Sequence, residues 1–389
     1  LVKALLEQEV RSAVELDARV QLLQKEKQAL ERQLLRRETR EDIYLNELRA
    51  ILSESPPTIE IPESPEPDVR ELNTEIAVLN LGDWHMGAKH DGEEYRFNLA
   101  LAKERINLAI DKFIAIVRDK RASLVIEELR IYLIGDMVEG DNMRLGHGWE
   151  VECPVALQAM LHAAPALAAA IVKLSGHFRK IRICGVPGNH GRNGKPKNDS
   201  HPITNWDGVV YEQARTLVEL AMAKGSNECE LEWDLPFDRF TNETGDYWFT
   251  VDYIYKWCIC LVHGEGGTGG ATPFNSIDKL LRRYADILSD PIDYLIMGHV
   301  HVDASIPANL RRAFVNGSLV TPSTYARKDL VCTSWPSQSA LFFSEKYGHT
   351  SSHMLHLSDA HMPSGIRTMT ALVHRGFYSV TKGGKISST

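Results

Sequence analysis

Acidic, amide and imidazole side chains follow short apolar runs at five places in the chain. The first is Gly82-Asp83-Trp84-His85, directly after the run 76–81. The runs 129–135, 180–186, 257–262 and 294–298 lead in turn to Asp136, to Asn189 and His190, to His263, and to His299 and His301. An Asp and a His two residues apart at a strand end can point a carboxylate and an imidazole at one ion. One such pair arises often by chance, but five strand ends together predict a single pocket.

Seven of these residues have the chemistry of metal ligands: Asp83, His85, Asp136, Asn189, His263, His299 and His301. Two carboxylates, one amide oxygen and four imidazoles are too many for one tetrahedral zinc ion and suit two ions that share a carboxylate. Two ions about 3.5–4 Å apart can acidify a bridging water and stabilise charge on phosphorus during in-line attack. Because the set contains no thiolate, we expect two divalent ions, with Mn²⁺ supporting activity and Fe or Zn as alternatives.

His190 is the remaining imidazole of the pattern and lies next to Asn189. We expect it to contact a phosphate oxygen or to protonate the leaving group, since an imidazole changes charge near neutral pH. The alternative is a structural role, in which His190 only caps the turn after its strand.

Strand-like and helix-like runs alternate from Glu75 onward, and these elements must position the ligands. Helical apolar spacing covers 99–117, 154–174, 207–223 and 276–288. Asp83, Asp136 and Asn189 are 53 residues apart, the length of a long β-α crossover. Such units predict a layered α/β core whose ligands gather at the carboxyl ends of the strands. More closely spaced strands predict a second, partly antiparallel sheet facing the first, at 229–233, 247–253, 257–262, 313–315 and 339–343.

The first fifty residues contain no Gly or Pro and repeat apolar residues in heptads. This pattern predicts a coiled-coil helix over residues 1–52. Its narrow apolar seam favours a homo-oligomer or a partner helix through residues 2–51; a single helix packed on the main domain is the alternative. Residues 53–74, rich in proline and acid, predict an extended linker. We expect the catalytic domain at 75–350 and a C-terminal extension at 351–389.

The composition is that of an ordinary folded protein, with 389 residues and a formal net charge of −8. An acidic balance argues against a surface coated in nucleic-acid-binding basic groups, though not against a local basic groove. The six cysteines show no paired metal spacing, so buried free thiols are expected. We find no run close to the roughly 18 apolar residues of a membrane helix and no secretory signal. We therefore expect no membrane partner and a cytoplasmic location, in the host cell if the chain is phage-encoded.

The series G-D-W-H, G-D-M-V-E-G, G-N-H-G, V-H-G-E and G-H-V-H resembles the motifs of the calcineurin-like metallophosphoesterases in order and spacing, over about residues 76–320. The resemblance implies a four-layer α/β/β/α sandwich of two facing sheets flanked by helices. It also implies two metal sites, one held by Asp83, His85, Asp136 and His301 and the other by Asp136, Asn189, His263 and His299. In that scheme Asp136 bridges the metals and His190 is the phosphate-contacting acid.

Two positions depart from the family pattern. Glu139 stands where many members carry Asp, and Gly191 stands where an Asp or Glu is common, so an acid that orients His190 is missing or replaced. The motif details and the stretch 315–318 are loosely similar to phage-encoded and prokaryotic members of the SbcD type, which are DNA-repair nucleases.

Several residues near the motifs have a simpler interpretation than catalysis. Arg192, Lys195 and Lys197 suit either a phosphate backbone or a solvated basic loop. Five others are expected at the surface and not as ligands: Arg144, His147, His201, Arg311 and Arg312. The glycine-rich segment 264–270 lacks the Lys of a phosphate-binding loop and predicts a flexible active-site loop.

These observations together predict a two-metal phosphodiesterase, and we expect a DNA exo- or endonuclease that uses a metal-bridging hydroxide. A phosphatase or a small-molecule or cyclic-nucleotide phosphodiesterase is the alternative. A third hypothesis is a non-catalytic scaffold that keeps the fold without its metals, and the completeness of the seven ligand positions argues against it.

Overall fold

The computed structural model describes residues 24–28, 73–91, 96–143, 146–194, 203–242, 246–265, 274–288, 291–320, 334–357, 378–380 and 386–388. The chain divides into two compact units, Leu1–Thr58 and Ile59–Thr389. The described residues of the first unit, 24–28, are helical and exposed. The rest of the predicted coiled coil at 1–52, and nearly all of the predicted linker at 53–74, lie outside the described residues.

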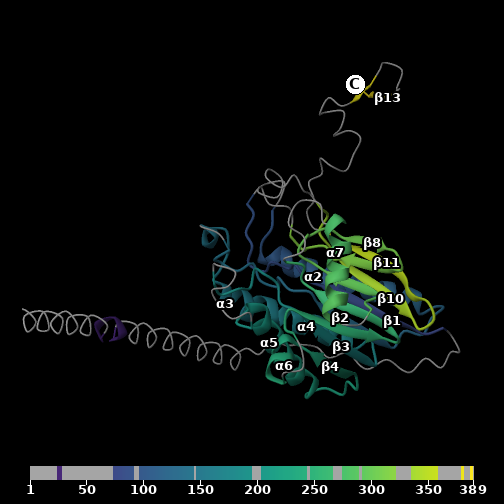
Figure 1. The fold of residues 1–389 in the computed structure, drawn as a ribbon, viewed down its shortest axis with the longest axis horizontal. Helices are drawn as coiled ribbons and strands as arrows, with labels where there is room; N and C mark the ends of the chain where they lie inside the picture. The colour runs from purple at the N-terminus through teal and green to yellow at the C-terminus, as the bar shows by residue number, and fades with distance from the viewer. Residues whose placement is uncertain are drawn as a thin grey trace, which may run out of the picture. The chain divides into compact units, whose positions relative to one another are not determined.

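The first sheet has six strands in the order β11-β10-β1-β2-β3-β4, which Figure 1 shows side by side. Its parallel part consists of β1 (Glu75–Leu81), β2 (Glu128–Leu133), β3 (Lys180–Gly185) and β4 (Glu230–Asp234). The strand β10 (Ser337–Ser344) pairs antiparallel with β1, and β11 (Gly348–His356) pairs antiparallel with β10. Because β1 to β4 are parallel, their carboxyl ends all lie at one edge of the sheet.

The second sheet has five strands in the order β5-β6-β7-β9-β8. They are β5 (Phe249–Ile254), β6 (Trp257–Val262), β7 (Tyr294–Met297), β8 (Ala304–Ala308) and β9 (Arg311–Val315). The outer strands β5 and β8 run antiparallel to their neighbours, so the sheet is partly antiparallel, as predicted. The assignment of 229–233 and 339–343 to this sheet was wrong, since they form β4 and β10 of the first sheet. Spacing along the chain does not reveal which sheet a strand joins, because strand pairing is non-local.

Helices cross over between the parallel strands. The helix α2 (Leu99–Lys120) follows β1. The short turn η1 (His147–Trp149) follows β2. A continuous helical stretch comes next, made of α3 (Val155–Leu157), η2 (Gln158–Ala163) and α4 (Ala164–Ser175). The helices α5 (Trp206–Met222) and α6 (Pro236–Asn242) flank β4, and α7 (Phe274–Leu288) connects β6 to β7. These positions agree with the predicted helices to within a few residues at most ends.

The core lies between the two sheets. Ile76, Val78 and Tyr132 of the first sheet pack with Leu261 and Ile296 of the second. Alternate residues of β1, such as Ala77 and Leu79, are also fully buried, which is the pattern of a strand covered on both faces. On the far side of the second sheet, side chains of β6, β7 and β9 pack with α7. The four-layer α/β/β/α sandwich is therefore confirmed.

The helical stretch Val155–Ser175 is long and apolar enough to cross a membrane by length and composition. The sequence expectation of no such run was therefore too strict. In the fold, half of the apolar window is buried, and Leu167, Ala168 and Ile171 are fully covered. The stretch includes a π-helical turn just before Pro165, where the missing backbone N–H of proline interrupts the α-helical ladder. These are the features of a core helix.

Two details concern the ends of the described fold. The strand β11 continues to His356 and so crosses the boundary that we expected at residue 350. Beyond it, β12 (Tyr378–Val380) and β13 (Ile386–Ser388) form a two-stranded sheet of their own.

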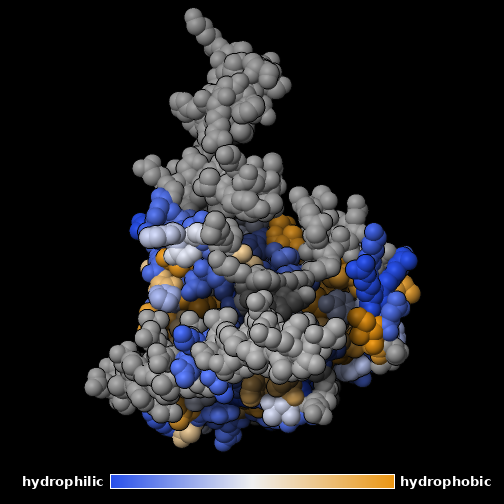
Figure 2. Space-filling model, turned by 60° about the vertical axis from the view of Figure 1, so that its left-hand side comes forward, coloured by the Kyte–Doolittle hydropathy of each residue, from blue (hydrophilic) through white to orange (hydrophobic). Residues whose placement is uncertain are grey.

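The described cysteines meet the expectation of buried free thiols except for Cys153, and Cys332 lies outside the described residues. Cys184, Cys229, Cys258 and Cys260 are buried free thiols, while Cys153 is partly exposed. On the face seen in Figure 2, the described residues form a mixture of hydrophilic and hydrophobic side chains, as is normal for a folded protein.

Candidate metal centre

Sharp turns at the strand ends position the predicted ligands. Asp83 and Asp136 follow β1 and β2, and His263 and His299 follow β6 and β7. Seven non-glycine residues of the described chain have positive φ, and five of them are predicted ligands: Asp83, His85, Asp136, His299 and His301. This left-handed backbone costs a side chain on the order of 1–2 kcal/mol, and such strain is concentrated at functional sites. It turns each chain sharply back, so that neighbouring ligands face one space.

Backbone hydrogen bonds hold the turns of the two sheets together. Asp83 N–H donates to Gly135 O at 2.9 Å, and His85 N–H donates to Asp136 O at 3.0 Å. The second sheet reaches across through His299, whose N–H donates to both Asp83 carboxylate oxygens at 3.1 and 3.0 Å. Ser318 Oγ donates to Asp83 O at 2.8 Å. The Asp83 turn is therefore held on both sides before any ligand binds.

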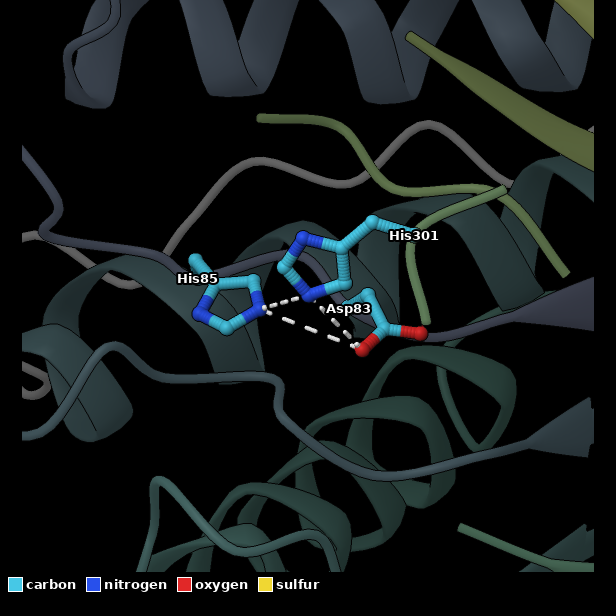
Figure 3. A group of neighbouring side chains, drawn as sticks. All are labelled: Asp83, His85 and His301. Carbon is cyan, nitrogen blue, oxygen red and sulfur yellow. Dashed lines mark hydrogen bonds and ion pairs between the residues drawn. The ribbon is translucent and has the colours of Figure 1, made fainter. Parts of the chain in front are cut away.

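The first group of side chains consists of Asp83, His85 and His301 (Figure 3). The Nε2 atoms of His85 and His301 are 2.9 Å apart, and His301 Nε2 is 3.3 Å from Asp83 Oδ1. His85 Nδ1 donates to Glu139 Oε2 at 2.7 Å, which leaves the lone pair of the neutral ring on Nε2. Asp83 is fully buried, whereas the His301 side chain is 37% exposed. Three donor atoms thus converge beside an opening to solvent.

The second group consists of Asp136, His263 and His299, with Asn189 beside them. His263 Nε2 lies 3.0 Å from Asp136 Oδ2, 3.0 Å from Asn189 Oδ1 and 3.2 Å from His299 Nδ1. His263 Nδ1 donates to Ile134 O at 2.7 Å, so the lone pair of its neutral ring is also on Nε2, facing the group.

The carboxylates give the centre a field that favours positive charge. Burial lowers the pKa of His263, but the Asp136 carboxylate outweighs it and raises that pKa to about 9. Burial raises the pKa of Asp83, yet hydrogen bonds to His301 and His85 bring it well below its usual range. His299 differs, because burial and the nearby His263 lower its pKa to about 4. The field that draws protons onto these imidazoles also draws metal cations.

Asp136 was predicted to bridge the two groups. Its Oδ2 faces His263, and its Oδ1 accepts the backbone N–H of His190 at 2.7 Å. Towards the first group it acts through charge. Burial lowers the pKa of His85, but Asp83 and Glu139, with a smaller contribution from the Asp136 charge, raise it well above its ordinary value. A direct contact of Asp136 with the first group is not among the described interactions, so the bridge stays a prediction.

Glu139 replaces the orienting acid that the motif departures left open. One carboxylate oxygen contacts His85, and the other accepts from His147 Nε2 at 2.7 Å. His190 Nδ1 donates to the Glu139 carbonyl oxygen at 2.9 Å and lies 3.4 Å from its carboxylate. The acid that faces the candidate catalytic imidazole therefore comes from the second motif and not from the residue after His190.

His147 corrects a sequence expectation. We expected a surface residue, but His147 is 1% exposed. Its Nδ1 accepts the backbone N–H of Met143 at 3.2 Å, so its proton is on Nε2, where it donates to Glu139. The sequence held a weak signal for this role, since a His eight residues after Glu139 lies within the same loop.

Asp207 is a second supporting residue that the sequence did not reveal. Its carboxylate accepts the backbone N–H groups of Asp136, Met137 and Gly188 at 2.7 to 2.9 Å. Burial, together with the Asp136 carboxylate, raises its pKa to about 6. Asn205 adds a bond from its side-chain amide to Gly188 O at 2.8 Å. These residues fix the second and third motif loops relative to each other.

The remaining sequence candidates have mixed outcomes. Arg192 is partly buried and bonds Asn189 O at 2.9 Å and the Glu265 carboxylate, so its loop contacts the glycine-rich segment. Arg312 donates to Ser305 Oγ at the outer strands of the second sheet. Five further predictions lie outside the described residues: Arg144, Lys195, Lys197, His201 and the segment 266–270.

The donor set fits divalent metal ions. It offers only carboxylate, amide and imidazole donors, and two imidazoles are oriented by hydrogen bonds from their far nitrogens, as metal-bound histidines are. The structure therefore supports divalent metal binding by these candidate ligand groups.

Comparisons with known proteins gave matches among solved structures alone. Neither protein-family models nor curated proteins matched the chain. The structure of vacuolar protein sorting 29 from Cryptosporidium parvum is 15% identical, with 72% of this chain and 97% of that chain covered at a TM-score of 0.31. A predicted phosphoesterase from Streptococcus pneumoniae TIGR4 is 10% identical, with 72% of this chain and 98% of that chain covered at a TM-score of 0.29. An archaeal phosphodiesterase is 12% identical, with 72% of this chain and 99% of that chain covered at a TM-score of 0.31.

At such TM-scores these similarities carry no argument about activity. In this chain, two facing sheets flanked by helices carry the five motifs at adjoining strand ends. The chain thus combines a four-layer α/β/β/α sandwich with the five motifs by which its sequence resembles the calcineurin-like metallophosphoesterases.

Proposed function

We propose that the protein is a two-metal phosphodiesterase that cleaves DNA. The observation that carries the proposal is the pair of donor groups, Asp83 with His85 and His301, and Asp136 with His263 and His299, at the shared edge of the two sheets. Each group brings its ligand atoms within 4.8 Å of one another. With Asn189 beside the second group, all seven predicted ligands take part.

The residues of the first group would hold one ion and those of the second, with Asn189, the other. Bound ions would supply the positive charge that acidifies a water and stabilises the transition state at phosphorus. The chain contributes a rigid frame for them. Glu139 and Ile134 O fix the two buried imidazoles by their Nδ1 atoms, so their orientation needs little reorganisation on binding.

The contacts of His190 support a role in proton transfer to the leaving group. Its Nδ1 is held by Glu139 O, while the ring stands edge-on to His85 with centroids 4.5 Å apart. Burial lowers the pKa of His190, but the Glu139 and Asp136 carboxylates outweigh it and raise the pKa above its ordinary value. In its imidazolium form, His190 would offer Nε2–H as the proton donor.

DNA is favoured as substrate over a phosphomonoester by the motif details that are similar to nucleases of the SbcD type. A phosphatase or small-molecule phosphodiesterase is the second candidate. The acidic net charge means that any DNA-binding surface is local and not spread over the whole protein.

The experiment compares substrates for the Mn²⁺-loaded protein: single- and double-stranded DNA, a cyclic nucleotide, a phosphopeptide and an aryl phosphate. Asp136→Asn serves as the inactive control, since it alters a ligand without removing volume. We expect cleavage of DNA that the control lacks. Hydrolysis confined to the other substrates would refute the choice of DNA, and full turnover by Asp136→Asn with two bound metals would refute the site.

A further inference from the structure

A short turn next to the metal centre exposes a large aromatic side chain. Trp149, in η1, is 91% exposed and is the most exposed of the large aromatic side chains in the described part of the chain. An indole that stays in water lacks on the order of 2 kcal/mol of the stabilisation that burial would give it. Its exposure therefore does not serve the stability of the fold.

The turn is fixed at the ligand edge of the first sheet. Lys89 N–H donates to Glu150 O at 3.0 Å, and Glu152 N–H donates to Gly87 O at 2.9 Å. These contacts bind the turn to the segment that follows His85. On its inner side the turn carries His147, which contacts Glu139. Trp149 thus stands only two residues from a side chain that reaches the candidate catalytic network, on a backbone that is tied down.

The surroundings of Trp149 favour a flat ring as its partner. Gly148 and Glu150, its neighbours in the chain, are exposed and not apolar, so among the described residues of this turn the indole is the one large apolar side chain. The carboxylate of Glu150 disfavours phosphate oxygens at the turn. A nucleobase meets both conditions, because stacking on an aromatic face needs neither a large apolar patch nor a positive charge.

We propose that Trp149 is a stacking platform for a nucleobase of single-stranded DNA bound across the candidate metal centre. This proposal rests on the proposed DNA-cleaving function and makes it specific. Stacking on one aromatic side chain contributes about 1–3 kcal/mol per base and tolerates any sequence. The turn would hold a base close to the phosphodiester being cleaved, and the substrate class would be DNA with an unpaired stretch.

The test uses the full Mn²⁺-loaded chain with Trp149→Ala, Trp149→Phe and the control Tyr347→Ala. Tyr347 is 69% exposed, but it follows Ser344, which pairs with Glu75 at the opposite end of β1 from Asp83. Binding of a fluorescein-labelled single-stranded oligonucleotide is measured by anisotropy. Cleavage is measured as kcat/KM for that oligonucleotide and for bis(p-nitrophenyl) phosphate.

For Trp149→Ala we expect about tenfold weaker DNA binding, in line with the loss of one stacked base. The ratio of kcat/KM for DNA to that for the aryl diester should fall by a similar factor. Trp149→Phe should retain most of both values, and Tyr347→Ala should match the parent.

The two proposals fail in different ways. DNA binding that is unchanged in Trp149→Ala, or an equal loss on the aryl diester, overturns the stacking platform alone. Binding that depends on Trp149 without any DNA cleavage overturns the nuclease and supports the platform. A parent protein that neither binds nor cleaves DNA overturns both.

Discussion

At the scale of single residues, we expect metal binding and proton transfer to belong to different side chains of the site. Asn189 Oδ1 faces His263, whereas the ring of the neighbouring His190 faces Glu139 and His85, with which it forms a third group that could hold an ion. Adjacent residues thus point into different parts of the site, so their removal should have different consequences.

His190→Ala should keep its metals and bind substrate, yet lose about 10²–10⁴-fold in turnover, the usual range for a positioned proton-transfer group. Asn189→Ala should instead weaken one metal site and recover partly with excess Mn²⁺. Metal content, thermal melting and single-turnover rates are measured on both variants. Loss of metal by His190→Ala to the same extent as by Asn189→Ala would make His190 a ligand; reduced stability with near-normal turnover would make it a turn cap.

His147 should act as a positioning residue through Glu139. Its removal in His147→Ala frees one carboxylate oxygen, so Glu139 holds His85 and His190 less firmly, and we expect kcat to fall about tenfold with KM nearly unchanged. His147→Gln keeps an N–H donor of similar reach and should restore much of the rate. The measurement is steady-state kinetics beside thermal melting. Equal rates for both variants, after correction for folded fraction, would show that the contact serves stability alone.

At the scale of elements, β11 brings a titratable ring into the core. His349 packs against Phe314 and Phe343, with ring centroids 4.7 and 5.7 Å away. Burial, and then the charge of Arg312, lower its pKa to about 4, against small opposing effects from the Ser351 backbone and Glu75. The folded protein therefore holds His349 neutral where the unfolded chain would bind a proton.

This contrast predicts a loss of stability in acid. Above the ordinary pKa of about 6.5 both states are neutral and His349 contributes nothing to the pH dependence. As the pH falls from there to about 4, only the unfolded state gains the proton, so the free energy of unfolding drops. His349→Phe should remove that part of the drop. Urea unfolding of both proteins at pH 7 and pH 5 tests it, and parallel losses would contradict the assignment.

At the scale of the whole molecule, the two compact units divide the chain between residues 58 and 59. The heptad pattern of 2–51 predicts association, and the proline-rich linker predicts that it is uncoupled from catalysis. Removal of residues 1–70 should therefore lower the oligomeric state and leave a folded, active domain that begins just before β1. Light scattering and turnover of both forms decide this. An unchanged mass would favour a helix that packs on its own domain or awaits another protein.

Much of the fold was readable from the sequence because its signals are local. Apolar runs that end in Asp83, Asp136 or His263 mark strands and their carboxyl ends, and the parallel crossover places such ends at one edge. The same local signals identified the ligand types. What the sequence predicted here was the layered α/β class and the positions of the candidate site residues.

Only the tertiary structure decided which strands share a sheet and which distant side chains support the site. The strands β4 and β10 joined the first sheet, and Asp207, predicted only as the start of a helix, accepts three backbone N–H groups from two motif loops. His147 was predicted at the surface, but in the structure its ring contacts Glu139. Most of these contacts join groups far apart in sequence, and their pairing is set by packing and hydrogen-bond geometry that local patterns do not encode.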